Sequence, residues 1–139
     1  MLVRELMTPN PAVCAKETGI RAVAELMVRH DCGAIPVCDE ENRVIGIITD
    51  RDITCRCIAR GLDPDTLTVA DCMTRPVAAV EEDASLARCL SVMESNRVRR
   101  AVVVDFEGRC VGMVSQADVA LKAPLQETGE VVKEVSRAR

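Results

Sequence analysis

Aromatic residues are almost missing from this 139-residue sequence, which has no tryptophan, no tyrosine and one phenylalanine, Phe106. Because proteins that bind single-stranded nucleic acid stack the bases on aromatic side chains, the chain lacks such a platform. Lysine and arginine total 18 against 22 acidic residues, the formal net charge is −4, and no extended basic run is present. We therefore expect no nucleic-acid partner.

Long apolar runs are also missing. No stretch approaches the roughly 20 apolar residues of a membrane-spanning helix, and no charged-then-apolar leader with a cleavage site begins the chain. We expect a cytoplasmic protein without a membrane partner. Because 48% of the residues are apolar, the chain can form one compact domain or two small repeats that share a core.

The sequence has little that resembles catalytic machinery. His30 is the only histidine, and neither a Ser/His nor a Cys/His arrangement nor a phosphate-binding glycine loop is present. The sequence therefore predicts no catalytic residues and no enzyme.

Cysteine, by contrast, is abundant, with eight residues. A disulfide scaffold is typical of secreted chains with small cores, whereas most of these cysteines lie among valines and isoleucines, where a thiol acts as a small apolar side chain. Only Cys55 and Cys57 in "CRC" are a candidate metal or redox pair. Since no second pair and no histidines accompany them, we expect no metal site.

The strongest pattern is an internal repeat. A shift of about 66 positions places "VRELMTPNPAVC" on "VADCMTRPVAAV" and "VIGIITDRDI" on "CVGMVSQADV" without a gap. We predict a first repeat over residues 1–62, a second over 63–122, and a tail over 123–139 whose helical spacing is weakened by Gly129.

Within each repeat the apolar spacing changes along the chain. Amphipathic helices are predicted over residues 19–30 and 85–96. Each is followed by two short apolar runs with a turn between them, and then by a second helix that begins near Asp50 or Gln116. The expected fold is mixed α/β (α+β), with two βαββα repeats. Neither repeat buries enough apolar area alone, so we expect them to pack with pseudo-twofold symmetry and to form two equivalent clefts.

In combination, the paired "MT" openings, "GAIPVCD" with "RRAVVVD", and "GIITDRD" with "GMVSQAD" resemble a tandem pair of cystathionine β-synthase (CBS) domains over residues 3–121. The resemblance implies a Bateman-type module with a regulatory role. It implies that an adenine nucleotide such as AMP, ADP or ATP binds in the clefts between the two repeats, that no cofactor is required, and that the chain forms a homodimer.

The polar residues at the second helix of each repeat are the candidate site. Thr49 and Asp52 are three residues apart at a helix start, so both side chains can reach one ligand beside free N–H groups. A carboxylate accepts hydrogen bonds from ribose hydroxyls, and a hydroxyl donates to phosphate or sugar oxygens. Ser115 and Asp118 repeat this pair. The alternative is that both pairs are plain helix caps.

Basic residues break the symmetry of the repeat. Arg97, Arg99 and Arg100 of the second repeat stand where the first has an aspartate, a glycine and an alanine. In the family, basic residues at the positions of Arg99 and Arg100 often contact ligand phosphates, although a solvated charge run is the alternative. The Ser115/Asp118 cleft should therefore prefer AMP, ADP or ATP. The Thr49/Asp52 cleft should accept a less charged adenosyl compound, with S-adenosylmethionine and NAD left open, or stay empty.

The resemblance also implies which residues contact the adenine, through backbone and apolar groups. For the Ser115/Asp118 cleft these are Pro11, Val13, Cys14, Cys32 and Gly33, and for the Thr49/Asp52 cleft they are Val77 and Val80.

Two other functions stay open. The chain could be a ligand-free interaction module that docks a partner enzyme or transporter through helix surfaces such as "ITCRCIARGL", residues 53–62. It could also be a thiol switch that uses Cys55 and Cys57.

Overall fold

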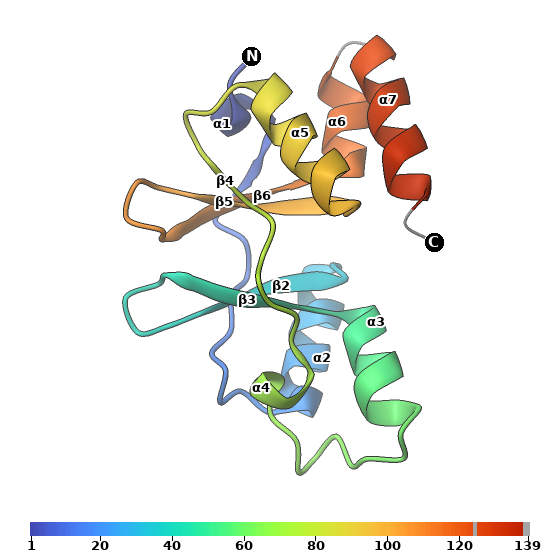
Figure 1. Cartoon of the computed structure of the whole chain (residues 1–139). Helices are drawn as coiled ribbons and strands as arrows, with labels where there is room; N and C mark the ends of the chain where they lie inside the picture. The colour runs from blue at the N-terminus through green and yellow to red at the C-terminus, as the bar shows by residue number, and fades with distance from the viewer. Residues whose placement is uncertain (124, 138–139) are drawn as a thin grey trace. The chain divides into compact units, whose positions relative to one another are not determined.

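The computed structural model describes residues 1–123 and 125–137, with the backbone alone at 125–128, 130 and 131. The chain divides into two compact units (Figure 1). Unit 1 contains Met1–Pro11 and the chain from Ala78 onward, and unit 2 contains Ala12–Val77. Each unit thus combines the opening segment of one sequence repeat with the body of the other. The repeat boundaries at residues 62 and 122 stay a prediction.

The sheet of unit 1 has four strands in the order β1-β6-β5-β4. Strands β1 (Thr8–Pro9), β6 (Cys110–Ser115) and β5 (Arg100–Val104) are antiparallel neighbours, whereas β4 (Ala79–Glu81) pairs with β5 in parallel. Alternating burial along β6 fits a strand that covers a core with one face.

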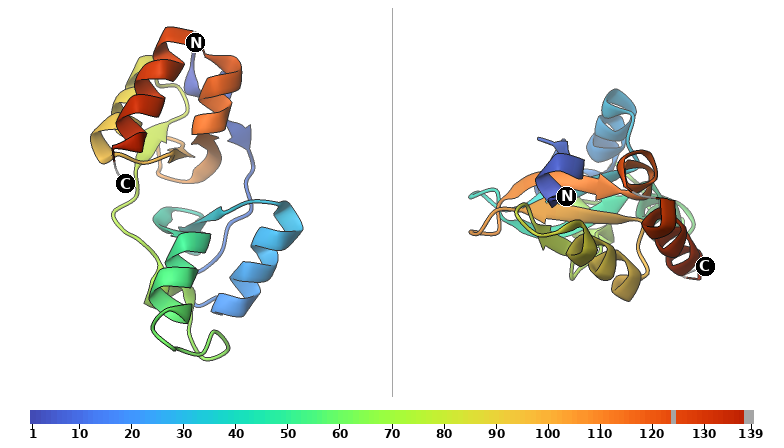
Figure 2. Two further views of the ribbon diagram at one scale, coloured as in Figure 1. Left: turned by 90° about the vertical axis from the view of Figure 1, so that its right-hand side faces the viewer. Right: turned by 90° about the horizontal axis from the view of Figure 1, so that it is seen from above.

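The helices of unit 1 lie on one side of this sheet (Figure 1). They are α1 (Val3–Leu6), α5 (Leu86–Asn96), α6 (Gln116–Lys122) and α7 (Leu125–Ser136). Helix α7 packs against α5 and α6 (Figure 2), and Val135 is buried among the core residues. The helix predicted in the tail is therefore present and packs on the chain's own core.

Unit 2 has a two-stranded antiparallel hairpin of β2 (Ala34–Cys38) and β3 (Val44–Thr49). Its helices lie on one side of the hairpin in Figure 1. They are α2 (Ile20–His30), α3 (Asp50–Ile53), which continues into the π-helical turn η1 (Thr54–Ile58), and α4 (Val69–Cys72).

The structure confirms the mixed α+β fold, both long amphipathic helices and the second helices at Asp50 and Gln116. The four-residue helices α1 and α4 were not predicted, because so short a segment shows no periodicity. A signal was present nonetheless, since each helix buries an apolar pair three residues apart, Val3 with Leu6 and Val69 with Cys72. The opening strand β1 has two residues.

Each unit has its own hydrophobic core. The expectation that cysteines fill apolar space is confirmed, because six of the eight are buried. Burial raises the pKa of Cys14 in unit 2 and of Cys89 in unit 1 to about 11, since desolvation disfavours the thiolate. Within residues 1–123 and 125–137, no helix is both long and apolar enough to cross a bilayer.

Candidate functional site

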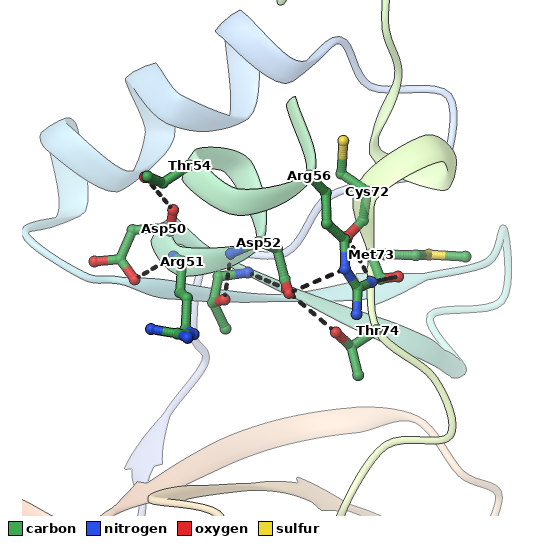
Figure 3. Close-up of polar contacts among 9 residues, drawn as sticks. Asp50, Arg51, Asp52, Thr54, Arg56, Cys72, Met73 and Thr74 are labelled. Atoms are coloured by element: carbon green, nitrogen blue, oxygen red, sulfur yellow. Dashed lines mark hydrogen bonds and ion pairs between the residues drawn. The ribbon is translucent and has the colours of Figure 1, made fainter. Parts of the chain in front are cut away.

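The Thr49/Asp52 pair stands where β3 ends and α3 begins, and Figure 3 shows Asp52 with its polar contacts. The Thr49 Oγ1 accepts a hydrogen bond from the Asp52 N–H at 3.0 Å, and the Thr49 N–H donates to Asp52 Oδ2 at 2.9 Å. This is a reciprocal capping box. The pair does cap the helix, and the cap fixes both side chains at the end of the strand.

The second oxygen of Asp52 is engaged as well. The Thr74 hydroxyl donates to Asp52 Oδ1 at 3.1 Å, and the Nε of Arg56 lies 4.0 Å from the same oxygen. Arg56 also donates to the carbonyl oxygens of Cys72 at 3.1 Å and Met73 at 2.8 Å. The side chain of Asp52 is 12% exposed. Both oxygens of this carboxylate therefore have partners within unit 2.

The Ser115/Asp118 pair forms the same capping box, but its aspartate has no partner outside the pair among the described residues. The Asp118 N–H donates to Ser115 Oγ at 3.2 Å, and Asp118 Oδ2 accepts from the Ser115 N–H at 2.9 Å and from its hydroxyl at 3.0 Å. Within the described part of the chain, Asp118 Oδ1 has no hydrogen bond or ion pair. Lys122, at the repeat position of Arg56, donates to the Leu6 carbonyl at 3.0 Å. Asp118 thus keeps one oxygen for another donor.

The arginines lie beside this second pair. Arg100 is the register partner of Ser115 across β5 and β6, and the Gln116 N–H donates to the Arg99 carbonyl at 2.8 Å. Arg99 is exposed and Arg100 is half-buried. Neither guanidinium has a hydrogen bond or ion pair among residues 1–123 and 125–137. Two uncompensated cations therefore flank the Ser115/Asp118 pair.

The matching positions of unit 2 carry no cation. Ala34 pairs with Thr49, and the Asp50 N–H donates to the Gly33 carbonyl at 3.0 Å. A Cβ built on Gly33 would lie 2.8 Å from Asp50 Oδ2, so this carboxylate lies directly against the glycine. The repeat counterpart of Asp50 is the neutral Gln116. The positions that hold Arg99 and Arg100 in unit 1 are therefore uncharged in unit 2, where Asp50 adds a carboxylate and the one cation within 4.0 Å of Asp52 among the described residues is Arg56.

The residues expected to contact adenine are distributed over both units. Cys14 and Val80 are 7% and 4% exposed and belong to the cores of units 2 and 1, so their side chains are occupied by packing. The others are partly buried or exposed at Pro11 in unit 1 and at Val13, Cys32, Gly33 and Val77 in unit 2. The adenine contacts stay a prediction.

The two cysteines of the candidate pair, Cys55 and Cys57, differ in exposure. Cys55 is exposed, whereas Cys57 is fully buried with its thiol donating to the Leu62 carbonyl at 3.5 Å. Among the described residues, no group of three or more histidine, cysteine, aspartate or glutamate side chains is arranged to hold a metal ion.

The sequence interpretation missed Thr74 and Arg56. A signal existed for both, because Thr74 repeats Thr8 in the "MT" openings and Arg56 repeats Lys122 as a cation after the motif. What the pattern does not show is that the second repeat's opening segment packs on the first repeat's strand. The Ile47 and Thr74 backbones bond at 3.0 and 2.8 Å.

Comparisons with known proteins agree with this architecture. The family model of the CBS domain matches twice, at residues 3–56 and 69–123. Hypoxic response protein 1 of Mycobacterium tuberculosis is 36% identical over 132 residues, which are 95% of this chain and 92% of that protein. A crystal structure of Hypoxic Response Protein I with two coordinated zinc ions has a TM-score of 0.80 at 35% identity and covers 89% of this chain and 100% of that one.

Two further solved structures contain adenosyl ligands. The CBS domain pair of protein MJ0100, in complex with 5′-methylthioadenosine and S-adenosyl-L-methionine, has a TM-score of 0.78 at 26% identity, covering 87% of this chain and 94% of that one. CBSX2 in complex with AMP has a TM-score of 0.76 at 26% identity, and the match covers 88% of this chain and 95% of that one. With both family matches on a mixed α+β fold, the chain belongs to the CBS domain family and carries two copies of the domain in tandem.

Proposed function

We propose that this protein is a regulatory module that binds an adenine nucleotide, AMP, ADP or ATP, at the Ser115/Asp118 pair. The observation that carries the proposal is the position of Arg100 directly opposite Ser115, beside a carboxylate with an oxygen still available. The AMP complex of CBSX2 and the adenosyl ligands of MJ0100 support the ligand class.

The chemistry of the pair suits a nucleoside phosphate. Asp118 Oδ1 accepts from a ribose hydroxyl while Oδ2 keeps the cap. Arg99 and Arg100 donate to phosphate oxygens, and each charge-assisted hydrogen bond is worth about 1.5–3 kcal/mol. A neutral nucleoside would keep the ribose contact to Asp118 and lose the phosphate contacts to the arginines.

The Thr49/Asp52 pair is proposed to bind a less charged adenosyl compound or to stay empty. Asp50 lies beside it and no arginine occupies the positions of Gly33 and Ala34, so a phosphate would lack the counterparts of Arg99 and Arg100 there. The sulfonium of S-adenosylmethionine is compatible with the charge of Asp50, and 5′-methylthioadenosine carries none.

The module would act by regulation and not by catalysis. A ligand that binds only the folded chain stabilises it by about 2.7 kcal/mol at a hundredfold excess over its dissociation constant. A ligand that binds one conformation better shifts the population toward it. We further propose a cytoplasmic homodimer that reports nucleotide levels to a partner enzyme or transporter.

The test compares two ligands that differ in phosphate alone. Isothermal calorimetry with AMP and with adenosine is carried out on the wild type and on Arg100→Ala, which places alanine where unit 2 already has Ala34. We expect AMP affinity to fall about tenfold or more, with adenosine affinity little changed. Arg29→Ala, which removes an exposed arginine from α2, is the control. Unchanged AMP affinity in Arg100→Ala would exclude the phosphate role.

One observation favours a second function, that of a ligand-free interaction module. Ile58 and Leu62, in the segment of residues 53–62, are 55% and 44% exposed. If this function is the right one, no adenine nucleotide will raise the melting temperature of the wild type at any dose. A dose-dependent rise that Arg100→Ala weakens would favour the nucleotide sensor.

A further inference from the structure

We propose that Thr74 is an internal competitor for the Thr49/Asp52 pair: its hydroxyl donates to Asp52 Oδ1 in the free protein and takes one of the acceptor positions that a ligand hydroxyl would use. This rests on the proposed function and names a residue that sets the affinity of the pair. The contact that carries it is the 3.1 Å hydrogen bond from Thr74 Oγ1 to Asp52 Oδ1 (Figure 3).

The backbone holds Thr74 in place for this contact. Its N–H donates to the Ile47 carbonyl at 2.8 Å, and its carbonyl accepts from the Ile47 N–H at 3.0 Å. On the other side of the segment, Arg56 donates to the Cys72 and Met73 carbonyls. Because the segment is fixed from both sides, the Thr74 hydroxyl reaches Asp52 at little further loss of conformational entropy.

Both oxygens of Asp52 already accept a hydrogen bond. Oδ2 accepts from the Thr49 N–H, Oδ1 accepts from Thr74, and the Arg56 guanidinium lies 4.0 Å from Oδ1. The carboxylate is also largely covered, with a side-chain exposure of 12%. Because so little of the carboxylate is exposed, a ribose hydroxyl that approaches Oδ1 competes with the threonine hydroxyl for the accessible side of this oxygen, and its displacement costs one hydrogen bond to a charged acceptor.

The other unit provides the same framework without the competitor. Thr8, the repeat counterpart of Thr74, pairs with Met113 on β6, and Lys122 holds the Leu6 carbonyl. Within the described residues, however, the Thr8 hydroxyl makes no hydrogen bond to Asp118, whose Oδ1 stays open. The two threonines thus form a matched pair, in which one hydroxyl competes for its aspartate and the other does not.

Removal of the Thr74 hydroxyl should therefore improve binding. Thr74→Val keeps the shape and the backbone bonds and deletes the donor. In calorimetry with 5′-methylthioadenosine we expect Thr74→Val to bind about tenfold more tightly than the wild type. The gain should disappear in Thr74→Val/Asp52→Asn, which assigns it to this pair. Thr8→Val is the matched control and should bind as the wild type does.

A second measurement does not depend on a ligand. In a double-mutant cycle, urea unfolding of Thr74→Val, Asp52→Asn and the double variant measures the coupling of the two side chains. Each variant changes the folding equilibrium constant by some factor relative to the wild type. We expect the factor of the double variant to differ about tenfold from the product of the two single-variant factors. The parallel cycle with Thr8→Val and Asp118→Asn should show no coupling.

The outcomes separate the two proposals. Tighter binding in Thr74→Val together with coupling to Asp52 supports the competition. If the wild type binds AMP but Thr74→Val gains no affinity, the competition is wrong and the proposed function stands. Absence of coupling in the cycle also overturns the competition alone. If no variant binds any adenosyl compound, both proposals are wrong.

Discussion

Gly112 of β6 lies so close to Met7 of the opening segment that a Cβ built on the glycine would stand 2.5 Å from the methionine Sδ. The same Cβ would be 3.0 Å from the Thr8 carbonyl oxygen. Unit 2 repeats the contact between Gly46 and Met73, with a Cβ 2.9 Å from the sulfur. The glycine of each repeat motif is therefore needed because the other repeat's opening segment crosses it.

Substitution of this glycine should destabilise the fold. In Gly112→Ala the methionine can turn aside, but the carbonyl belongs to a strand that is hydrogen-bonded to β6. We expect a loss of about 1–3 kcal/mol in the free energy of unfolding, as in other overpacked cores, measured by urea denaturation.

Gly129→Ala is the control for Gly112→Ala. Its Cβ has nothing within 4 Å, and the residue lies inside α7. Because alanine is the better helix former, this change should stabilise the protein by about 0.5–1 kcal/mol. Equal effects of both substitutions would contradict the close approach at Gly112.

The sequence predicts the long elements and the two polar pairs well. Helices α2 and α5 are long enough for an apolar stripe to show, and the spacing from Thr49 to Asp52 and from Ser115 to Asp118 is local. Each pair is fixed by a cap that the sequence carries within four residues. The repeat also identifies Ala34 as the counterpart of Arg100, and both stand at the register position opposite the hydroxyl residue of their pair.

The contacts between opening segments and strands could not be predicted in this way. Alignment assigns Thr74 to the second repeat, whereas the structure packs it on β3 of the first. Which opening segment pairs with which strand depends on long-range packing, and both repeats offer the same motif. Thr74 and Arg56 were missed for this reason, although each stands at a repeated position.

The cap at Ser115 should be measurable apart from any ligand. Ser115→Ala removes the acceptor of the Asp118 N–H and leaves the first turn of α6 without its cap. We expect the free energy of unfolding to fall by about 0.5–2 kcal/mol, measured by urea denaturation. Ser115→Thr, which introduces the residue of unit 2, should stay near the wild type. If both variants lose the same stability, the effect comes from packing and not from the cap.

Thiol reactivity should follow burial. At neutral pH we expect iodoacetamide to modify Cys55 first, since it is exposed, and the half-buried Cys32 more slowly. The six buried cysteines should react only after unfolding, because burial keeps the reagent away from the sulfur. Mass spectrometry of the labelled native protein gives the order.

A Cys55→Ser variant is the control and should lose the fast phase. Modification of Cys57 at the rate of Cys55 in the native protein would contradict its burial. It would also revive the thiol switch at these two residues, since both would then be accessible to an oxidant.

Stability should fall as the pH rises from about 9 to about 11. Burial raises the pKa of Cys14 and Cys89 from 9.0 to about 11, and burial, then the neighbouring Cys57 and Asp71, raises that of Cys72. Above pH 9 the unfolded chain loses these protons while the folded chain keeps them, so the free energy of unfolding decreases with pH. Each of Cys14 and Cys89 contributes on the order of 2 kcal/mol over the window. Below pH 9 these groups give no slope.

Urea denaturation between pH 8 and pH 10.5 tests this dependence, and the absence of tyrosine removes one other group that titrates there. Cys89→Ala should reduce the slope, because it removes one of the thiols whose pKa burial raises. If the free energy of unfolding stays constant across this range, the folded protein ionises its core thiols as readily as the unfolded chain does. These cysteines would then not be enclosed in the two cores.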